Sequence, residues 1–273
     1  MKLPDYHVHT AFCGHADGEI ADYVARARSL GLPEMGFADH LPLLHVYDPT
    51  LTMAESQLAT YVSAVIDLRT RHADLGVLLG IEVDYLDEAT YRAHGLEDGP
   101  ARVRDLLARH PFDYVLGSVH FLGDFMFDHP DHRDEWERRD VAAVYREYYG
   151  RVADAAASGL FTVMAHLDLP KKLGQRPDGD VTADEDAALD ALAASGVALE
   201  VNTSGWRMPV AEAYPAPDLL ARAQQRDIRL VFGSDAHSPG DVGADFDRAL
   251  DLARGAGYAS FLRLSDGAEV SLP

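Results

Sequence analysis

Residues 228–237 read IRLVFGSDAH, in which a short apolar run is followed at once by Asp235 and His237. A run of this length, with β-branched and aromatic residues, is typical of a buried β-strand. The arrangement recurs along the chain, where further short apolar runs lead into a histidine, an acid or an amide. The predicted strands cover residues 6–8, 35–38, 77–81, 114–119, 161–165, 197–201 and 228–232.

The residues that end these runs share a chemistry. In chain order they are His7 and His9 with His15 close behind, Asp39 and His40, Glu82, His120, His166, Asn202, and Asp235 with His237. Because the carboxyl ends of parallel strands meet at one mouth of a barrel, we expect these side chains to lie together. Imidazole and carboxylate are the ligands of Zn, Mn and Fe(II), and a carboxylate can bridge two ions. The pattern therefore predicts a metal site.

A single histidine after a strand is more often a helix cap or a hydrogen-bonded surface group than a metal ligand. Nine ligand-type residues at equivalent positions are much harder to explain in that way, and His7 and His9 alternate along one strand, so both can face one ion. The remaining histidines fit helices or loops and are interpreted as solvated or structural: His45, His72, His94, His110, His129 and His132.

Helical patterns separate the predicted strands. Thr52 with Glu55, and Thr182 with Glu185, each fit a capping box ahead of periodic apolar residues. The length alone allows one α/β barrel or two smaller domains. Since strands and helices alternate without a linker, repeat or break in composition, we expect residues 1–273 to form a single βα-repeating domain.

Two irregular segments follow predicted strands. Residues 121–139 lack periodicity and are predicted to form a long loop, of the kind that often serves as an active-site lid and could include His129 and His132. Residues 203–217 contain Trp206 and Arg207 and are expected on the same face of the barrel.

The composition limits which binding partners and which cellular compartment are expected. The 45 acidic against 24 basic residues give a formal charge of −21, which argues against long nucleic acid but not against a small anion at a metal site. No apolar run reaches the roughly 18 residues of a membrane span, and residues 1–6 have no apolar signal core. The single cysteine, Cys13, permits no intrachain disulfide, so a cytoplasmic location is expected. Cys13 could touch a metal, although a lone cysteine is more often a small buried apolar residue.

Several of these motifs resemble a known family. Asp5-Tyr6-His7-Val8-His9-Thr10, Phe12-Cys13-Gly14-His15 and Phe37-Ala38-Asp39-His40 resemble the PHP (polymerase and histidinol phosphatase) superfamily. Gly117-Ser118-Val119-His120, Glu200-Val201-Asn202-Thr203-Ser204-Gly205 and Gly233-Ser234-Asp235-Ala236-His237 resemble its histidinol-phosphatase branch. The resemblance implies a distorted seven-stranded (β/α) TIM-like barrel, a trinuclear metal site and hydrolysis of L-histidinol phosphate.

Site roles follow from the resemblance position by position. It implies one ion held by His7, His9, Glu82 and Asp235, a second by His15, His40 and His237, and a third by Glu82, His120 and His166. The sequence does not choose among Zn, Mn and Fe, because all three accept these ligands.

Further residues are candidates for catalysis and substrate binding. Asp39, beside His40, is a candidate to orient an imidazole or to protonate the leaving alkoxide. Arg207 is the first choice for binding phosphate, because arginine binds oxyanions in a bidentate manner. Lys171, Lys172 and Arg176 are weaker candidates for the same role. Acids in the loops, including Asp124 and Asp128, could suit the amine and imidazole of the substrate that the resemblance implies.

Two other interpretations remain open at this point. The metals could serve a PHP phosphoesterase that acts on sugar phosphates, nucleotides or short oligonucleotide ends. Alternatively, they could only stabilise a binding or scaffolding module. The sequence carries no signature of an oligomeric state.

Overall fold

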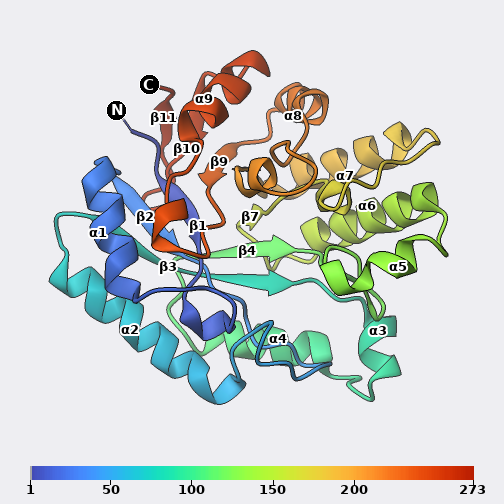
Figure 1. The fold of residues 1–273 in the computed structure, drawn as a ribbon, viewed down its shortest axis with the longest axis horizontal. Coiled ribbons are helices and arrows are strands. Elements are labelled where there is room, and N and C mark those ends of the chain that lie inside the picture. The colour runs from blue at the N-terminus through green and yellow to red at the C-terminus, as the bar shows by residue number, and fades with distance from the viewer. Residues whose placement is uncertain (1) are drawn as a thin grey trace.

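The computed structural model describes residues 2–273, and it contains a seven-stranded parallel sheet with strand order β1-β2-β3-β4-β7-β8-β9. These strands are β1 (Asp5–Val8), β2 (Glu34–Phe37), β3 (Gly76–Asp84), β4 (Tyr114–Ser118), β7 (Val163–Met164), β8 (Ala198–Asn202) and β9 (Leu230–Gly233). Each overlaps a predicted strand, with ends that differ by up to three residues. Helices surround the curved sheet (Figure 1), so the fold is the predicted distorted TIM-like α/β barrel.

The barrel is nearly closed. Its two edge strands, β1 and β9, are joined by one bridge, between Val8 and Ala236, and do not form a continuous ladder. The backbone N–H of His9 donates to Ala236 O (2.9 Å). A side chain completes the seam: the buried carboxylate of Asp5 accepts hydrogen bonds from Ser234 N (2.9 Å) and Gly243 N (2.9 Å). The first strand is thereby held against the last, which places their carboxyl ends side by side.

The helices pack apolar faces against the strands. They are α1 (Ile20–Leu30), α2 (Leu58–Arg71), α3 (Glu88–Ala93), α4 (Gly99–Ala108), α5 (Arg133–Trp136), α6 (Val141–Ala157), α7 (Thr182–Ser195), α8 (Pro217–Gln224) and α9 (Phe246–Gly255). Short 3₁₀ turns are η1 (Ala11–Cys13), η2 (Glu55–Gln57), η3 (Pro130–His132), η4 (Leu169–Lys171), η5 (Ser204–Arg207) and η6 (Pro239–Asp241). No helix within residues 2–273 is long and apolar enough to cross a membrane.

Both predicted capping boxes are wrong. Near Thr52, the chain first forms η2, and the Gln57 side chain accepts from Ala54 N (2.9 Å) before α2 begins. Thr182 is the first residue of α7 rather than its cap, and its N–H donates to the Asp180 side chain (2.9 Å).

The segment after β4 is more ordered than the predicted loop. It forms a hairpin of β5 (Phe121–Leu122) and β6 (Phe125–Met126), followed by η3 and α5. Trp136 is buried and donates from Nε1 to Phe127 O (2.8 Å). This aromatic packing, which has no sequence periodicity, fixes the segment beside the mouth of the barrel.

The C-terminal hairpin of β10 (Ser260–Leu262) and β11 (Glu269–Ser271) lies at the opposite end of the barrel. Leu262 packs in a buried cluster with Tyr6 and Tyr114 from the barrel interior. Leu264 N donates to the Tyr6 hydroxyl (3.1 Å), which joins the segment after β10 to the first strand. The hairpin therefore packs over the end of the barrel that is opposite to the predicted site.

Candidate metal centre and active site

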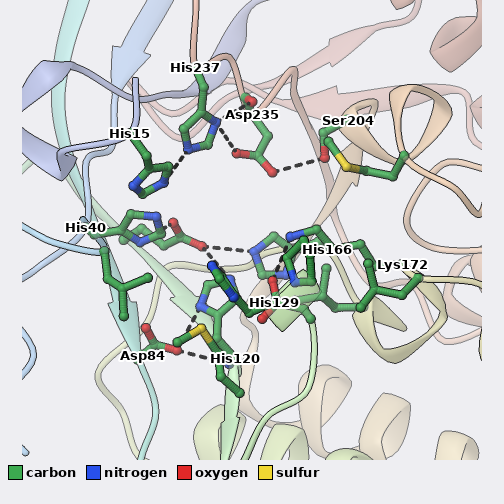
Figure 2. A pocket seen from close by; sticks show the side chains of 18 of the residues that line it. His15, His40, Asp84, His120, His129, His166, Lys172, Ser204, Asp235 and His237 are labelled. Carbon is green, nitrogen blue, oxygen red and sulfur yellow. Dashed lines mark hydrogen bonds and ion pairs between the residues drawn. The ribbon is translucent and has the colours of Figure 1, made fainter. Parts of the chain in front are cut away.

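All nine predicted metal ligands lie at the carboxyl-terminal mouth of the barrel. Figure 2 shows the imidazoles of His15, His40, His120, His166 and His237 gathered around a common centre. His7, His9 and Glu82 belong to the same cluster and are buried. The strand ends that the sequence separates by more than 200 residues are thus brought together as predicted.

Glu82 stands at the middle of this cluster. Its Oε2 lies 3.0 Å from His40 Nδ1 and 3.4 Å from His7 Nε2, and its Oε1 lies 2.9 Å from His166 Nε2. His9 Nε2 is 3.5 Å from Oε2, and His120 Nε2 is 3.9 Å from Oε1. Because its two oxygens face different sets of imidazoles, Glu82 has the geometry of a bridging ligand.

The ligand atoms fall into overlapping groups whose members lie within 4.8 Å of one another: His7 with His9 and Glu82, Glu82 with His120 and His166, and His9 with His40 and His237. Asp235 Oδ1 joins the first group at 3.2 Å from His9 Nε2. His15 Nε2 lies 3.0 Å from His237 Nε2.

The buried polar atoms of this cluster fit divalent cations. Five of them have no hydrogen-bond partner among residues 2–273: Nε2 of His7, Nδ1 and Nε2 of His9, Oε2 of Glu82 and Nδ1 of His166. Buried polar groups without partners are costly and rare in folded proteins. A mixed set of imidazole nitrogens and carboxylate oxygens suits Zn, Mn or Fe(II), so the donor set matches the predicted metals.

Carboxylates behind the cluster orient its imidazoles. Glu200 Oε1 lies 2.8 Å from His7 Nδ1, and Asp84 Oδ1 lies 2.8 Å from His120 Nδ1. Each contact engages the outer ring nitrogen and leaves Nε2 directed at the centre, which is the usual arrangement around metal-bound histidines. Gly233 makes room for one of these contacts, because a Cβ there would lie 1.9 Å from Glu200 Oε1.

Two candidate ligands have left-handed backbone, which is unusual for residues other than glycine: His166 (φ 27°) and Asp235 (φ 53°). His166 N donates to Glu200 Oε2 (3.0 Å). Asp235 Oδ2 accepts from Ser204 Oγ (3.0 Å) and Asn202 Nδ2 (3.3 Å), so its Oδ1 is left for the histidines. Strain of this kind is held in place by its surroundings and is concentrated at functional sites.

Carboxylates around the inner imidazoles, His7 and His9, stabilise the positively charged form of these rings. Burial lowers the pKa of His7, but the carboxylates of Glu200, Asp235 and Glu82 outweigh it and hold that pKa well above its ordinary value. For His9, burial is likewise outweighed, by Asp235 and Asp39, and the pKa rises to about 9. The same field that would retain a proton in the metal-free protein favours a bound cation.

Imidazoles nearer the solvent behave differently. Burial and the neighbouring His40 and His9 lower the pKa of His15 to about 4. Burial and the neighbouring His9 also hold the pKa of His237 well below its ordinary value, although Asp235 opposes the shift. These two rings are neutral at pH 7 and can donate a lone pair without first losing a proton.

A cavity of about 480 Å³ opens above the cluster. Its apolar wall is formed by Leu43, Leu51, Phe121, Met126, Leu169, Leu173 and Met208. Cationic side chains also reach it: Arg133, Lys172 and Arg207. The cavity thus combines a polar, metal-binding floor with a cationic and apolar wall.

Arg207 occupies the cavity wall as predicted. Its Nη2 donates to Ser234 O (2.7 Å), and its Nε lies 3.6 Å from Asp241 Oδ1. Nη1 is buried and has no hydrogen-bond partner within residues 2–273. An arginine that is held on one side and free on the other is positioned to bind an oxyanion.

The three other candidates for substrate binding lie in different surroundings. Lys171 is buried outside the cavity, where its Nζ lies 2.7 Å from Asp168 and 2.9 Å from Glu212. Arg176 also pairs with Glu212 (2.7 Å) and does not line the cavity. Neither residue lines the cavity, and the charge of each is paired with an acid of the scaffold. The neighbouring Lys172 lines the cavity instead.

Asp39 is fully buried and does not line the cavity. It accepts hydrogen bonds from Thr10 N (3.1 Å) and His40 N (2.8 Å), and its Oδ1 lies 3.7 Å from His9 Nδ1. This position favours orientation of His9 over contact with a leaving group.

The remaining histidines and the cysteine have simpler surroundings. His129 lines the cavity, while the His132 ring pairs with Glu135 (2.7 Å) outside it. Cys13 is buried near His9 and His15, and burial raises the pKa of its thiol to about 12, so it is a neutral packing group in the absence of metal.

Three residues of this site were not predicted from the sequence to have the roles described here: Glu200, Asp84 and Ser204. A signal was present for two of them: Asp84 lies two residues after Glu82, and Glu200 two residues before Asn202, so each shares a strand face with a residue already identified. Asp128, one of the two loop acids named as able to suit cationic groups of the substrate, reaches the cavity wall from the segment after β6, whereas Asp124 does not line the cavity.

Comparisons with known proteins agree with this geometry. Residues 5–204 match the PHP domain family. The chain is 43% identical to the probable histidinol-phosphatase of Deinococcus radiodurans over 93% of this chain and 94% of that one. It is 29% identical to the histidinol-phosphatase of Bacillus subtilis over 92% of this chain and 99% of that one.

A crystal structure of histidinol phosphate phosphatase from Lactococcus lactis, complexed with zinc, L-histidinol and phosphate, has a similar fold. Its TM-score is 0.75, at 22% identity over 94% of each chain. From the family match and the similarity to the Deinococcus protein, the chain belongs to the PHP domain family.

Proposed function

We propose that this protein is a metal-dependent phosphomonoesterase that hydrolyses L-histidinol phosphate to L-histidinol and phosphate. The observation that carries the proposal is one cavity lined by seven of the nine candidate ligands and by Arg207, whose Nη1 has no hydrogen-bond partner among residues 2–273. The names of the Deinococcus and Bacillus relatives support this substrate.

We further propose that the cluster holds three divalent ions. His7, His9, Glu82 and Asp235 would hold the first, His15, His40 and His237 the second, and Glu82, His120 and His166 the third. The zinc in the Lactococcus structure supports a divalent metal, and Mn and Fe(II) suit the same ligands. When bound, such ions neutralise charge on the phosphoryl group and lower the pKa of a nucleophilic water.

The side chains around the proposed ions would bind the phosphate, orient the metal ligands and exclude water. The free Nη1 of Arg207 would donate to a phosphoryl oxygen, which neutralises charge as the ester is cleaved. Glu200 and Asp84 would keep the Nε2 atoms of His7 and His120 directed at the centre. The apolar wall would exclude water around the alcohol portion of the substrate.

We also propose that residues 1–273 act as a single catalytic domain in histidine biosynthesis, and that the enzyme is cytoplasmic. The lone Cys13 supports the last point, because proteins of reducing compartments rarely rely on disulfides. The charge of −21 supports a small ester over a long nucleic acid.

The test is phosphate release by metal-free protein reconstituted with Mn, Zn or Fe(II), coupled to elemental analysis of protein purified without added metal. L-Histidinol phosphate would be compared with a sugar phosphate, a nucleoside monophosphate and a nuclease substrate. We expect bound metal and fastest release from L-histidinol phosphate. Faster release from another ester would overturn the substrate. No release from any ester, together with a lower melting temperature on chelation, would indicate a scaffolding role.

A further inference from the structure

An ion pair in the cavity wall is not explained by metal binding. Lys172 Nζ lies 2.7 Å from Asp128 Oδ2, and both residues line the cavity. Asp128 is 7% exposed and follows β6, whereas Lys172 follows η4 and lies beside His166 in Figure 2. Two loops that are distant in sequence thus meet through opposite charges at the edge of the proposed metal site.

Asp128 differs from the other acids that line the cavity. Glu82 and Asp235 face the imidazoles of the proposed metal site, and Asp84 is hydrogen-bonded to His120. Asp241 lies near Arg207 and accepts from Ser238 Oγ (2.9 Å). Within residues 2–273, the only hydrogen-bond partner of the Asp128 side chain is Lys172, which is a long and flexible cation.

Binding of a phosphate group would disturb this pair. A phosphate above the metal cluster competes for Lys172, because a dianion attracts an ammonium group more strongly than a single carboxylate does. If Lys172 moves to the phosphate, the buried Asp128 carboxylate loses its partner. An unpaired buried charge is strongly unfavourable, so an ester without a replacement cation binds at a disadvantage.

An ester that brings its own cation avoids this loss. L-Histidinol phosphate has a primary amine on the carbon next to the ester CH₂ group, and such an amine is protonated at neutral pH. Its ammonium group can take the place of Lys172 beside Asp128 while Lys172 binds the phosphate. One internal ion pair is then exchanged for two ion pairs with the substrate.

We propose that the Asp128–Lys172 pair selects phosphate monoesters that carry a cationic nitrogen close to the phosphate, with Lys172 binding the phosphate and Asp128 the cation. The inference rests on the proposed function and specifies its substrate class. It makes Asp128 a specificity-determining residue, since the pair penalises neutral esters as well as favouring cationic ones.

The first experiment compares kcat/KM for L-histidinol phosphate and glycerol 3-phosphate in metal-loaded wild type and Asp128→Asn. We expect the variant to lose about tenfold or more on L-histidinol phosphate and to keep or gain activity on glycerol 3-phosphate, because a neutral amide needs no cationic partner. The matched control is Asp124→Asn, which removes a charge from the same segment but outside the cavity, where Asp124 pairs with His94. The control should keep the wild-type ratio.

The outcomes separate this inference from the proposed function. Equal losses on both esters in Asp128→Asn, or an unchanged ratio, would overturn the role of the pair while wild-type activity on L-histidinol phosphate still supported the function. A wild type that cleaves glycerol 3-phosphate but not L-histidinol phosphate would overturn both.

A second measurement needs no variant. The pair predicts that L-histidinol and inorganic phosphate bind together better than either binds alone, because each ligand alone leaves one member of the pair without a partner. L-Histidinol should lower the Kd of phosphate for the metal-loaded protein about fivefold or more, and glycerol should not. A phosphate Kd that is the same with and without L-histidinol would overturn the inference.

Discussion

At the scale of single residues, Glu200 connects several parts of the site. Its carboxylate contacts His7 Nδ1 (2.8 Å), accepts from His166 N (3.0 Å) and accepts from Asn202 Nδ2 (3.0 Å). If His7 presents the lone pair of its Nε2 to a metal, its Nδ1 carries the proton. All three partners then donate hydrogen bonds to Glu200, which must accept at both oxygens. A glutamine can supply an acceptor at only one end, so its amide would oppose a donor at the other.

We therefore predict that Glu200→Gln weakens metal binding about 10–100-fold, as measured by competition with a chelator of known affinity. Glu34→Gln is the matched control, because Glu34 is also buried but accepts a hydrogen bond from Tyr6 near the opposite end of the barrel (2.6 Å). Equal weakening in the two variants would mean that Glu200 has only a general structural role.

A second prediction at this scale concerns phosphate binding. Replacing Arg207 with alanine removes the unpaired Nη1 from the cavity and should raise KM for the phosphate ester more than tenfold, or about 1.4 kcal/mol of lost binding. Steady-state kinetics would be compared with those of Arg176→Ala, in which only the outward pair with Glu212 is lost. If the two variants have the same KM, Arg207 does not bind the phosphate.

These residues also show where prediction from sequence stops. The sequence identifies Arg207 because it follows the sixth strand, and the structure places it in the cavity. It does not distinguish Lys171 from Lys172, although Lys171 ends a 3₁₀ turn, Lys172 follows it, and the two side chains point in different directions. Their partners decide the outcome, and Asp168, Glu212 and Asp128 come from three separate segments.

At the scale of secondary-structure elements, the strands were predictable because their ends carry a repeated chemical pattern. The C-terminal hairpin was not, since nothing in its sequence indicates that Leu262 enters the barrel. The segment after β4 was predicted as irregular for a related reason: it is fixed by contacts such as Trp136 with Phe127, which leave no periodic pattern. Tertiary packing determines both elements.

The hairpin supports a prediction about stability. Leu262 is 4% exposed and packs against the barrel interior, so Leu262→Ala should lower the free energy of unfolding by about 2–4 kcal/mol. Denaturant titration measures the loss, and Val270→Ala in the partner strand, which is only half-buried, should cost less. Metal affinity should be unchanged, because the hairpin lies at the other end of the barrel. A large loss of metal affinity would contradict this separation of stability from function.

At the scale of the whole molecule, the charges of the site predict how metal binding depends on pH. In the metal-free protein, burial lowers the pKa of His120, but Asp84 outweighs it and raises the pKa to about 10, while His9 is raised to about 9. Both rings are therefore protonated at pH 7, although a free histidine has a pKa of about 6.5. A metal ligand must be deprotonated, so binding has to displace these protons.

We expect metal added to metal-free protein at pH 7 to release protons, and the apparent affinity to rise with pH until these imidazoles have lost their protons. Calorimetry in buffers of different ionisation enthalpy would measure the release. Binding without proton release would show that these histidines are neutral before the metal arrives, contrary to the field described above.

The arrangement of the whole molecule depends on bringing β1 and β9 together, since His7 and His9 lie on one side of that seam and Asp235 and His237 on the other. The alternation of strands and helices was enough to predict a barrel and its active mouth. How the barrel closes was not predictable, because the seam relies on one backbone bridge and on Asp5, whose partners across the seam, Ser234 and Gly243, lie more than 200 residues away in sequence.

Everything proposed for this site depends on these distant imidazoles and carboxylates sharing divalent cations at the barrel mouth. Anomalous diffraction at the zinc absorption edge, from crystals of zinc-reconstituted protein, would locate such ions. We expect three peaks, one within coordination distance of each proposed ligand set, with two of them flanking Glu82. If no peak lies among His7, Glu82, His166 and Asp235, the proposed metal site is wrong.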